Sequence, residues 1–409
     1  MKKGLKFIVI ILSLILFSIP VAAQEVYYIY RSIDYQDNVN GDTILTGIND
    51  DDKIIGYYCD DHYECYGPNE PSNFMFDLAT ESFSDILSPP LTKIKVEGIN
   101  NLFYPNIVGG ATNEDCIGCA FILDGDTNIF TALPFPRAAD ANGINDKDII
   151  VGNTEVLIPG GGQKISAFIY DFTNGASYYD HEASYPYPQT YFSDVNNDDT
   201  IVGFYPFLGP NNNVQLNSFI FKNNIYSDFV YPGASITRAR GINDANQIVG
   251  EYVFDGGHGF LLSGLSFSPI DFPGAYRTMA TGINNAGRIV GYYWDNTYLH
   301  KIHGFIATPV WPRMIGPVLG FFDKAVSAGT LIGIGGGKSG SNKLNTLRNM
   351  IEVSGNLIEK KSITGACQKL MEVYKKTDGN PSPQDFVSGA AAPGLARLIK
   401  NLRTDLQCK

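Results

Sequence analysis

A short pattern of apolar and polar positions returns six times along the chain. Each copy has a Gly-Ile-Asn segment or a variant of it, a polar turn, and then an Ile-Ile-Gly or Ile-Val-Gly run. The Asn residues of successive copies are separated by 51, 45, 51, 47 and 41 positions, and they are Asn49, Asn100, Asn145, Asn196, Asn243 and Asn284. Six copies at this spacing indicate a repeat architecture in which each unit buries its apolar surface against its neighbours.

Each unit predicts four short strands. In the clearest copy, alternating apolar residues predict strands over 227–231, 237–242, 247–253 and 259–262. The Asn-Asp turn between the second and third strands suits a tight hairpin, because both residues tolerate left-handed backbone. One such meander cannot bury both of its faces. We therefore expect an all-β six-bladed propeller over residues 24–308.

The two ends of the repeat region complement each other. The first unit begins one strand early, at Tyr27–Tyr35, and the last unit ends one strand short, at Gly304–Thr308. We expect the N-terminal strand near Tyr30 to pair with the segment near Phe305 and so close the ring.

The units resemble the HAF-type extracellular repeats of bacterial exported proteins, whose pattern is Gly-Ile-Asn, Ile-Val-Gly-Tyr and His-Gly-Phe. Copies five and six match it best, with His258-Gly259-Phe260 and His303-Gly304-Phe305. Copies one to four lack the His, and copy four has Asp194 in place of the first Gly. The resemblance implies export and a repeat architecture, and it implies no defined activity.

From Pro309 onward the apolar period becomes helical. The apolar residues at helical spacing include Leu344, Leu347, Ile351, Ile358, Ala366, Leu370, Val373, Leu395, Ile399 and Leu402. We expect a linker with a short helix over residues 309–341 and a small all-α helical domain over residues 342–409. The tail resembles the FIMAH module found at the C-terminus of exported bacterial proteins, through Phe321-Phe322-Asp323, Gly365-Ala366-Cys367-Gln368 and Leu395-Ala396.

The N-terminus has the pattern of a secretory signal peptide. Lys2, Lys3 and Lys6 precede an apolar run over residues 7–17, and Val21-Ala22-Ala23 is a small-residue cleavage site. We expect residues 1–23 to be removed near Ala23 and the mature protein to be secreted, to the periplasm or the cell exterior. The run is too short to cross a bilayer well, so no membrane span is expected.

Charge argues against nucleic acid as a partner. Residues 24–308 hold 13 Lys and Arg against 35 Asp and Glu, a net charge of −22, whereas residues 309–409 hold 14 against 7. An acidic body of this kind repels both phosphate backbones and anionic lipid.

Six cysteines in an exported chain favour three disulfides. The expected pairs are Cys59 with Cys65, Cys116 with Cys119, and Cys367 with Cys408. A zinc site made by the first four cysteines is the alternative, and the exported compartment favours disulfides over it.

Motifs for catalysis are missing from the sequence. It has neither a Gly-x-Ser-x-Gly elbow nor a His-Glu-x-x-His metalloprotease motif. Asp194, Asn196 and Asp198 have the alternate spacing of calcium ligands, but Asp199 replaces the turn Gly and Tyr205 replaces the bidentate acid. We interpret this segment as a hairpin turn, with a weak calcium site as the alternative, and no other cofactor is indicated.

Long loops and binding-type side chains gather at one end of the predicted propeller. The connections between blades share that end with the long loops 59–73, 154–166, 206–217 and 294–303. Those connections carry Tyr and Arg, the common anchors of binding surfaces. The candidates are Arg137, Tyr185, Tyr187, Tyr191, Arg238, Arg240, Tyr276 and Arg277.

These observations favour an exported, non-enzymatic binding protein that recognises an extracellular glycan or protein through its loop-rich face. Two alternatives remain open. One is a hydrolase or lyase that acts on polysaccharide through loop carboxylates. The other is a purely structural component of the cell surface or matrix, assembled through the tail.

Overall fold

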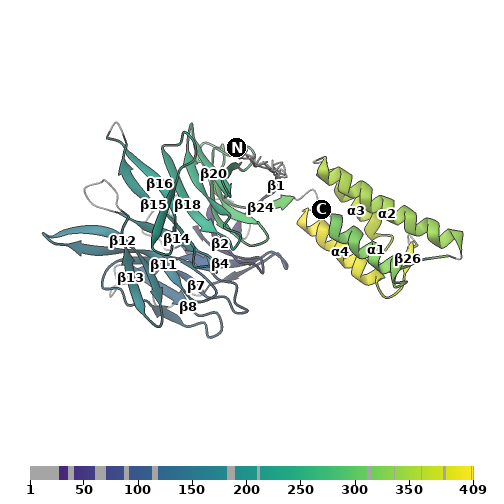
Figure 1. Ribbon diagram of the computed structural model, residues 1–409, viewed down its shortest axis with the longest axis horizontal. Coiled ribbons are helices and arrows are strands. Elements are labelled where there is room, and N and C mark those ends of the chain that lie inside the picture. Colours follow the sequence, from purple (N-terminus) through teal and green to yellow (C-terminus); the bar gives the residue numbers. More distant parts are fainter. Residues whose placement is uncertain are drawn as a thin grey trace, which may run out of the picture.

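The computed structural model describes residues 27–35, 41–59, 71–86, 92–112, 118–181, 189–209, 212–310, 315–335, 337–360, 362–380, 384–406 and 408. The chain forms a sheet-rich body, from β1 to β24, and a helical body, from α1 to α4 (Figure 1). The predicted signal peptide lies outside the described residues. None of the described helices is long and apolar enough to cross a membrane.

The strands of the sheet-rich body are short. They are β1 (Tyr27–Ile33), β2 (Asp42–Ile48), β3 (Lys53–Cys59), β4 (Ser72–Asp77), β5 (Ser82–Asp85), β6 (Thr92–Ile99), β7 (Ile107–Thr112), β8 (Cys119–Leu123), β9 (Phe130–Ala132), β10 (Ala139–Ile144), β11 (Ile150–Ile158), β12 (Gly162–Asp171), β13 (Gly175–Tyr179), β14 (Tyr191–Val195), β15 (Ile201–Leu208), β16 (Val214–Lys222), β17 (Ile225–Phe229), β18 (Ile236–Ile242), β19 (Ile248–Val253), β20 (Gly257–Ser263), β21 (Ser266–Ile270), β22 (Arg277–Ile283), β23 (Ile289–Trp294) and β24 (Ile302–Val310).

Consecutive strands pair antiparallel in groups of four. Each group begins one strand later than the sequence predicts: the segment expected as the first strand of its unit, 227–231, forms β17 and pairs with β16 of the preceding group, and β21 completes the group that begins with β18. Three groups, β2–β5, β6–β9 and β10–β13, are separate sheets. The groups β14–β17 and β18–β21 are joined into one sheet by a single parallel pair, Leu216 with Ile236.

The remaining group combines the two ends of the repeat region. Its strand order is β1-β24-β23-β22, so the N-terminal strand completes the sheet built by the last repeat. Tyr30 lies opposite Ala307 and Ser32 lies opposite Phe305. The predicted pairing of the N-terminal strand with the segment near Phe305 is therefore confirmed.

The six repeated asparagines form a closed cycle of hydrogen bonds. Each is buried or nearly so, and its Nδ2 donates to the backbone oxygen of the equivalent Asn in the next repeat, at 3.0–3.4 Å. The last of these bonds joins Asn284 back to Asn49. Within a turn, the Asn Oδ1 accepts a backbone N–H, as from Lys53 to Asn49. The Asn of each repeat thus shapes its own turn and fixes the next repeat in place.

A phenylalanine lies at the centre of each group of strands. These residues come from the third strand of each observed group and are fully buried: Phe74, Phe121, Phe168, Phe219, Phe260 and Phe305. Burial of an aromatic ring of this size contributes about 2–3 kcal/mol.

The helical body contains α1 (Ile315–Ser327), α2 (Lys338–Glu359), α3 (Ile363–Tyr374) and α4 (Ala392–Asp405), with a short pair of strands, β25 (Ile332–Gly333) and β26 (Val387–Ser388). Helix α1 lies in the segment that the sequence assigns to a linker. Its buried residues, among them Val318 and Phe322, join one apolar core with those of α2, α3 and α4.

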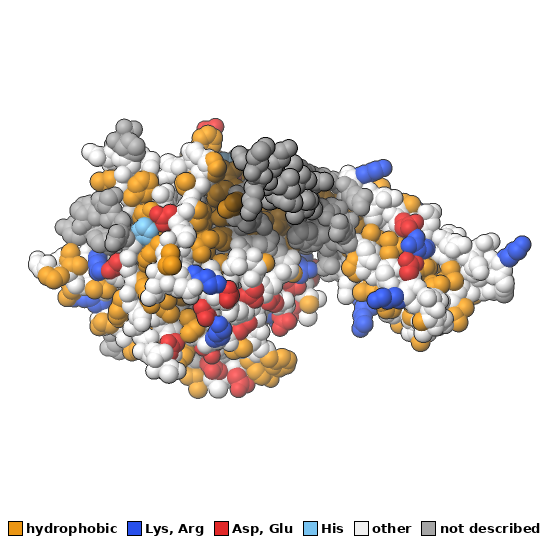
Figure 2. Space-filling model, in the orientation of Figure 1, with side chains coloured by type: hydrophobic (Ala, Val, Ile, Leu, Met, Phe, Trp, Pro, Cys, Tyr) orange, Lys and Arg blue, Asp and Glu red, His pale blue; other side chains and the backbone are white. Residues whose placement is uncertain are grey.

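Strand β1 contacts both bodies. The hydroxyl of Tyr27 donates to the backbone oxygen of Ile358 at 2.6 Å, and Tyr27 and Ile29 pack against the helical core. Figure 2 shows Asp and Glu side chains gathered on the sheet-rich body, and Lys and Arg side chains spread over the helical body. This distribution follows the charge difference in the sequence.

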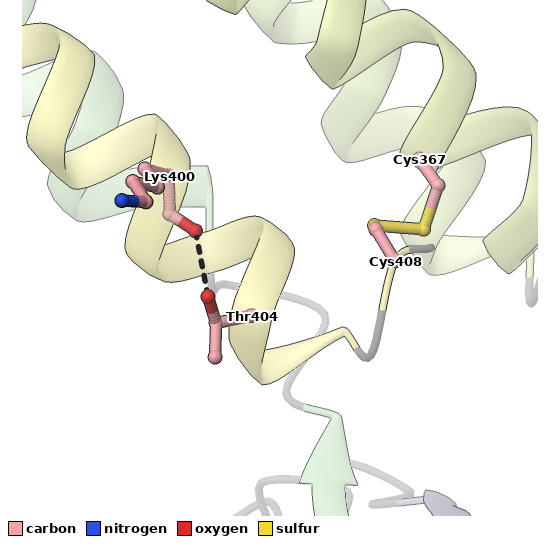
Figure 3. Close-up of a disulfide and its surroundings, with 4 residues drawn as sticks. All are labelled: Cys367, Lys400, Thr404 and Cys408. Carbon is pink, nitrogen blue, oxygen red and sulfur yellow. Dashed lines mark hydrogen bonds between the residues drawn. A yellow bond between two sulfur atoms is a disulfide. The ribbon is translucent and has the colours of Figure 1, made fainter. Parts of the chain in front are cut away.

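A disulfide joins the end of the chain to α3 (Figure 3). It links Cys367 to Cys408 across 41 residues of sequence, which is the pair expected from the sequence. Cys59 and Cys119 are also disulfide-bonded, and their expected partners, Cys65 and Cys116, lie outside the described residues.

Replacing Cys408 by serine is expected to destabilise the helical body by about 2–4 kcal/mol, because the unfolded chain regains the freedom that the cross-link removes. Urea unfolding followed by circular dichroism at 222 nm measures the change. A serine variant is preferable to reduction of the wild type, which would also open the disulfides of Cys59 and Cys119. Unchanged helix stability would contradict a stabilising role for this bond.

Candidate binding site in the central cavity

A β-bulge interrupts the first strand of every four-stranded group, which is the strand that carries the Gly-Ile-Asn segment or its variant. In each pairing of a first strand with its neighbour, the register shifts across one residue, which is left without a partner. Each of these residues stands three positions before a cycle asparagine. They are Thr46, Glu97, Asn142, Ser193, Arg240 and Thr281. A bulge redirects a side chain locally, and bulges are frequent beside binding sites.

All six bulged residues line one cavity of about 360 Å³. The backbone and side chains around them come from β2, β6, β10, β14, β18 and β22, so every repeat contributes to its wall. A second, smaller cavity of about 50 Å³ is lined by four of the six cycle asparagines and by five of the residues that directly follow a cycle asparagine. Ile48, Ile99 and Ile283 line both cavities, so an aliphatic layer lies between the two.

Aromatic side chains from the second strands complete the larger cavity. Tyr57, Phe204 and Tyr292 follow the Gly of their Ile-Ile-Gly or Ile-Val-Gly runs and occupy equivalent positions. Tyr191 stacks on Phe204 with the ring centroids 4.7 Å apart. The cavity therefore combines aromatic surfaces with polar groups from the bulges.

Two carboxyl groups in this cavity are held in unusual environments. Burial raises the pKa of the Glu97 carboxyl to about 7, although the positive charges of Arg240 and Lys95 oppose the shift. Burial also raises the pKa of the Asp140 carboxyl, against a hydrogen bond from Asn153 and the charge of Lys95. Glu97 and Arg240 belong to repeats that are three apart in a cycle of six, so they contribute to opposite sides of the wall.

Asp194 takes the place that glycine holds in the other five repeats. Its carboxylate accepts the backbone N–H of Val195 at 2.8 Å and that of Ile242 at 2.9 Å, which ties β14 to the next repeat. Burial raises its pKa to about 7, against the effect of these two hydrogen bonds.

Asp194 should make the protein less stable as the pH rises from about 4 to about 7. The unfolded chain releases this proton near pH 4 and the folded chain near pH 7, so the folded state binds it more tightly across that window. Relative to Asp194→Asn, the wild type should lose on the order of 1–3 kcal/mol of unfolding free energy between these pH values. Urea unfolding at several pH values measures the difference, and Asp255→Asn, in an exposed turn, is the control. Parallel pH profiles for the wild type and Asp194→Asn would contradict this prediction.

Three arginines converge on one buried glutamate beside the cavity. Glu251 on β19 has 2% of its side chain exposed, and its carboxylate accepts from Arg238 at 2.5 Å, Arg240 at 3.2 Å and Arg277 at 3.0 Å. Burial opposes ionisation of Glu251, but the guanidinium groups outweigh it and lower the pKa of its carboxyl. We call these four residues the arginine cluster.

The structure brings together four of the eight binding residues predicted from sequence. Tyr191 and Arg240 line the cavity, and Arg238 and Arg277 join Arg240 in the arginine cluster. Tyr276 is 61% exposed and stacks on His300 at 4.3 Å, and Arg137 is exposed and does not line the cavity. Tyr185 and Tyr187 lie outside the described residues.

The predicted calcium ligands do not converge. Asp194 binds backbone N–H groups, Asn196 belongs to the asparagine cycle, and Asp198 forms an ion pair with Lys222. In the part of the chain that the structure describes, no group of three or more His, Cys, Asp or Glu is arranged to hold a metal ion. The segment is a hairpin turn, which is the preferred interpretation from sequence.

Sequence reasoning missed the residues that give the cavity its character, among them Glu97, Asp140 and Phe204. The signal was present in the aligned repeats. A polar residue stands directly before the Gly of each Gly-Ile-Asn or its variant, where strand alternation alone would not single it out. The following Gly is a recognised sign of a bulge.

Comparison with known proteins assigns a family and no activity. Residues 22–258 match the family described as a protein of unknown function, DUF3466, and the chain belongs to that family. No curated protein matches the chain. The resemblances to HAF-type repeats and to the FIMAH module stay predictions.

Several solved structures are similar at low identity. TolB from Acinetobacter baumannii is 14% identical, with a TM-score of 0.40 over 56% of this chain and 55% of that chain, about half its length. The fucose-specific lectin from Aleuria aurantia is 11% identical, with a TM-score of 0.38 over 65% of this chain and 95% of that chain. Trypanosoma rangeli sialidase is 7% identical, with a TM-score of 0.42 over 70% of this chain and 58% of that chain.

Proposed function

We propose that the sheet-rich body is a six-bladed β-propeller of an exported, non-enzymatic protein, and that its central cavity binds a sugar unit of an extracellular glycan. The observation that carries this proposal is the lining of the cavity. Aromatic rings and the six polar side chains of the bulges line one cavity of about 360 Å³. That volume falls in the range of about 300–1,000 Å³ typical of small-molecule sites.

The chemistry of the lining suits a carbohydrate. A sugar ring has an apolar face that packs on aromatic side chains and a rim of hydroxyls that exchange hydrogen bonds with planar polar groups. The rings of Tyr191 and Tyr292 supply the first kind of surface, and Glu97, Asn142 and Arg240 supply the second. The wall is held in place by strands and by the asparagine cycle, so the site is preformed.

Export is supported by the ends of the chain. The N-terminal pattern is that of a signal peptide, and the Cys367–Cys408 disulfide is the kind of bond that persists in oxidising compartments. A glycan ligand outside the cytoplasm agrees with both observations.

A glycan array probed with the purified protein tests the proposal, followed by calorimetry with the best ligand. Tyr57→Ala combined with Tyr292→Ala should weaken binding at least tenfold. Tyr178→Ala removes a half-exposed ring on β13, outside the cavity, and should leave binding unchanged. Binding of no glycan by the wild type, or equal binding by all variants, would refute the proposal.

Glu97 and Asp140 support a second candidate function. Both carboxyl groups lie in one cavity and have raised pKa values. A polysaccharide hydrolase uses two such groups, one as the acid and the other as the base or nucleophile. A turnover assay on mixed polysaccharides separates the two functions. Release of reducing ends by the wild type, abolished in Glu97→Gln, would favour the hydrolase, and binding without turnover would favour the binding protein.

A further inference from the structure

The arginine cluster carries more positive charge than its own glutamate requires. One carboxylate balances one guanidinium, yet Glu251 is contacted by three, which leaves these four residues with a net charge of +2. This excess stands in a region of net charge −22, where only 13 residues are basic. Three arginines around one carboxylate are more than the neutralisation of Glu251 requires.

The guanidinium groups are held rigidly. Arg238 lies over the ring of Phe204 at 4.9 Å, and Arg277 lies over the ring of Trp294 at 5.0 Å. Cation–π contacts and the shared carboxylate fix both planes before any ligand arrives.

The cluster also keeps unused donors. The Nε–H groups of Arg238 and Arg277 are buried and have no hydrogen-bond partner among the described residues. A guanidinium has five N–H donors, and each of the three arginines donates one hydrogen bond to Glu251. The side chains of Arg238 and Arg277 are still 26% and 34% exposed, so an incoming anion can reach the outer part of both guanidinium groups.

The arginine cluster lies next to the cavity that is proposed to bind a sugar. Arg240 is a bulged residue and lines the cavity, while Arg238 and Arg277 stand near the starts of their strands, at the end where the connections between repeats lie. We infer that the arginine cluster binds the anionic group, a carboxylate or a sulfate, of an acidic glycan whose sugar ring occupies the cavity. This inference rests on the proposed function and specifies its ligand class.

Matched tetrasaccharides test the inference by calorimetry. The probes are oligomers of galacturonic acid, of galactose sulfate and of neutral galactose. An acidic oligomer should bind at least tenfold more tightly than the neutral one, and Arg238→Lys and Arg277→Lys should abolish this preference because lysine lacks the planar fork. Arg31→Gln, which breaks only an exposed ion pair with Glu81, is the matched control and should bind like the wild type.

A second variant moves Arg277 without changing its charge. A Cβ at Gly257 would lie 2.3 Å from Arg277 Nε and 2.5 Å from its Cγ, so Gly257→Ala must displace that side chain. It should reduce the acidic preference at least tenfold in a folded protein. Equal binding of acidic and neutral oligomers, unaffected by these variants, would overturn the inference and leave glycan binding intact.

A fluorescence titration with sulfate tests the anion site without any glycan. The sequence has two tryptophans, so Trp311→Phe leaves Trp294, beneath Arg277, as the single tryptophan, whose emission is excited selectively over that of tyrosine. Sulfate, compared with chloride at equal ionic strength, should change its fluorescence, and Arg277→Lys should remove the response. A sulfate response without binding of any oligomer would sustain the anion site and refute the glycan proposal. No response and no binding would refute both.

Discussion

Replacing Gly152 by alanine is expected to destabilise the sheet-rich body by about 3 kcal/mol or more. The bulge of β10 pushes the backbone oxygen of Asp140 toward this glycine, and a Cβ would lie 1.9 Å from that oxygen and 2.8 Å from Phe168. Neither atom can move freely, because one belongs to the paired backbone and the other to a fully buried ring. Thermal and urea unfolding of the purified variant measure the loss.

Gly320→Ala in α1 is the matched control. No atom outside the helix backbone lies within 4 Å of the added Cβ, and the position is exposed. The substitution should therefore stabilise its helix by about 0.5–1 kcal/mol. Equal stabilities of Gly152→Ala and the wild type would show that the bulge does not require this glycine.

Asn145→Ala is expected to cost about 3 kcal/mol, because it leaves several buried groups without partners. The Asn145 side chain donates to the backbone oxygen of Asn196 and to Asp199, both at 3.0 Å, and accepts the backbone N–H groups of Lys147 and Ile149. Alanine removes all four bonds in a residue that is 3% exposed. Urea unfolding gives the change in free energy.

The comparison is Asn174→Ala, in an exposed turn where the amide also bonds a nearby carboxylate, that of Asp171. Water replaces the lost bond there, so the change should stay within about 0.5 kcal/mol. A similar cost at both positions would mean that the asparagine cycle adds nothing to stability beyond an ordinary turn.

The repeat pattern was sufficient to predict most strands and their order, although it assigned the strand at 227–231 to the following group instead of the preceding one. Alternation and the recurring Asn turn located β18 and β19 within a residue or two, and the missing strand at Gly304 pointed to the partner of β1. These features depend on local sequence and on the need to cover an open sheet edge, which can be read from one chain.

The cavity could not be predicted in the same way. Its wall depends on the bulge, which turns Glu97 and Arg240 away from the alternation of their strands. The charges beside the cavity come from residues of different repeats. For example, Arg277 forms an ion pair with Glu251 of the preceding repeat. Loop length drew attention to one end of the predicted propeller and not to these strand residues.

Asp194 shows that a residue with the spacing of a calcium ligand can have a structural role. Its spacing with Asn196 and Asp198 resembles a cation loop, yet its carboxylate bonds the backbone of the next repeat. The sequence signal for this role was the substitution itself, since the five equivalent positions are glycine.

The residues that follow the cycle asparagines alternate between aspartate and asparagine around the ring: Asp50, Asn101, Asp146, Asn197, Asp244 and Asn285. Each accepts a backbone N–H from the preceding repeat, and the amide of Asn197 also bridges the carboxylates of Asp146 and Asp244. An odd number of units would set two carboxylates or two amides side by side. The strict alternation of carboxylate and amide acceptors around the cycle therefore requires an even number of units.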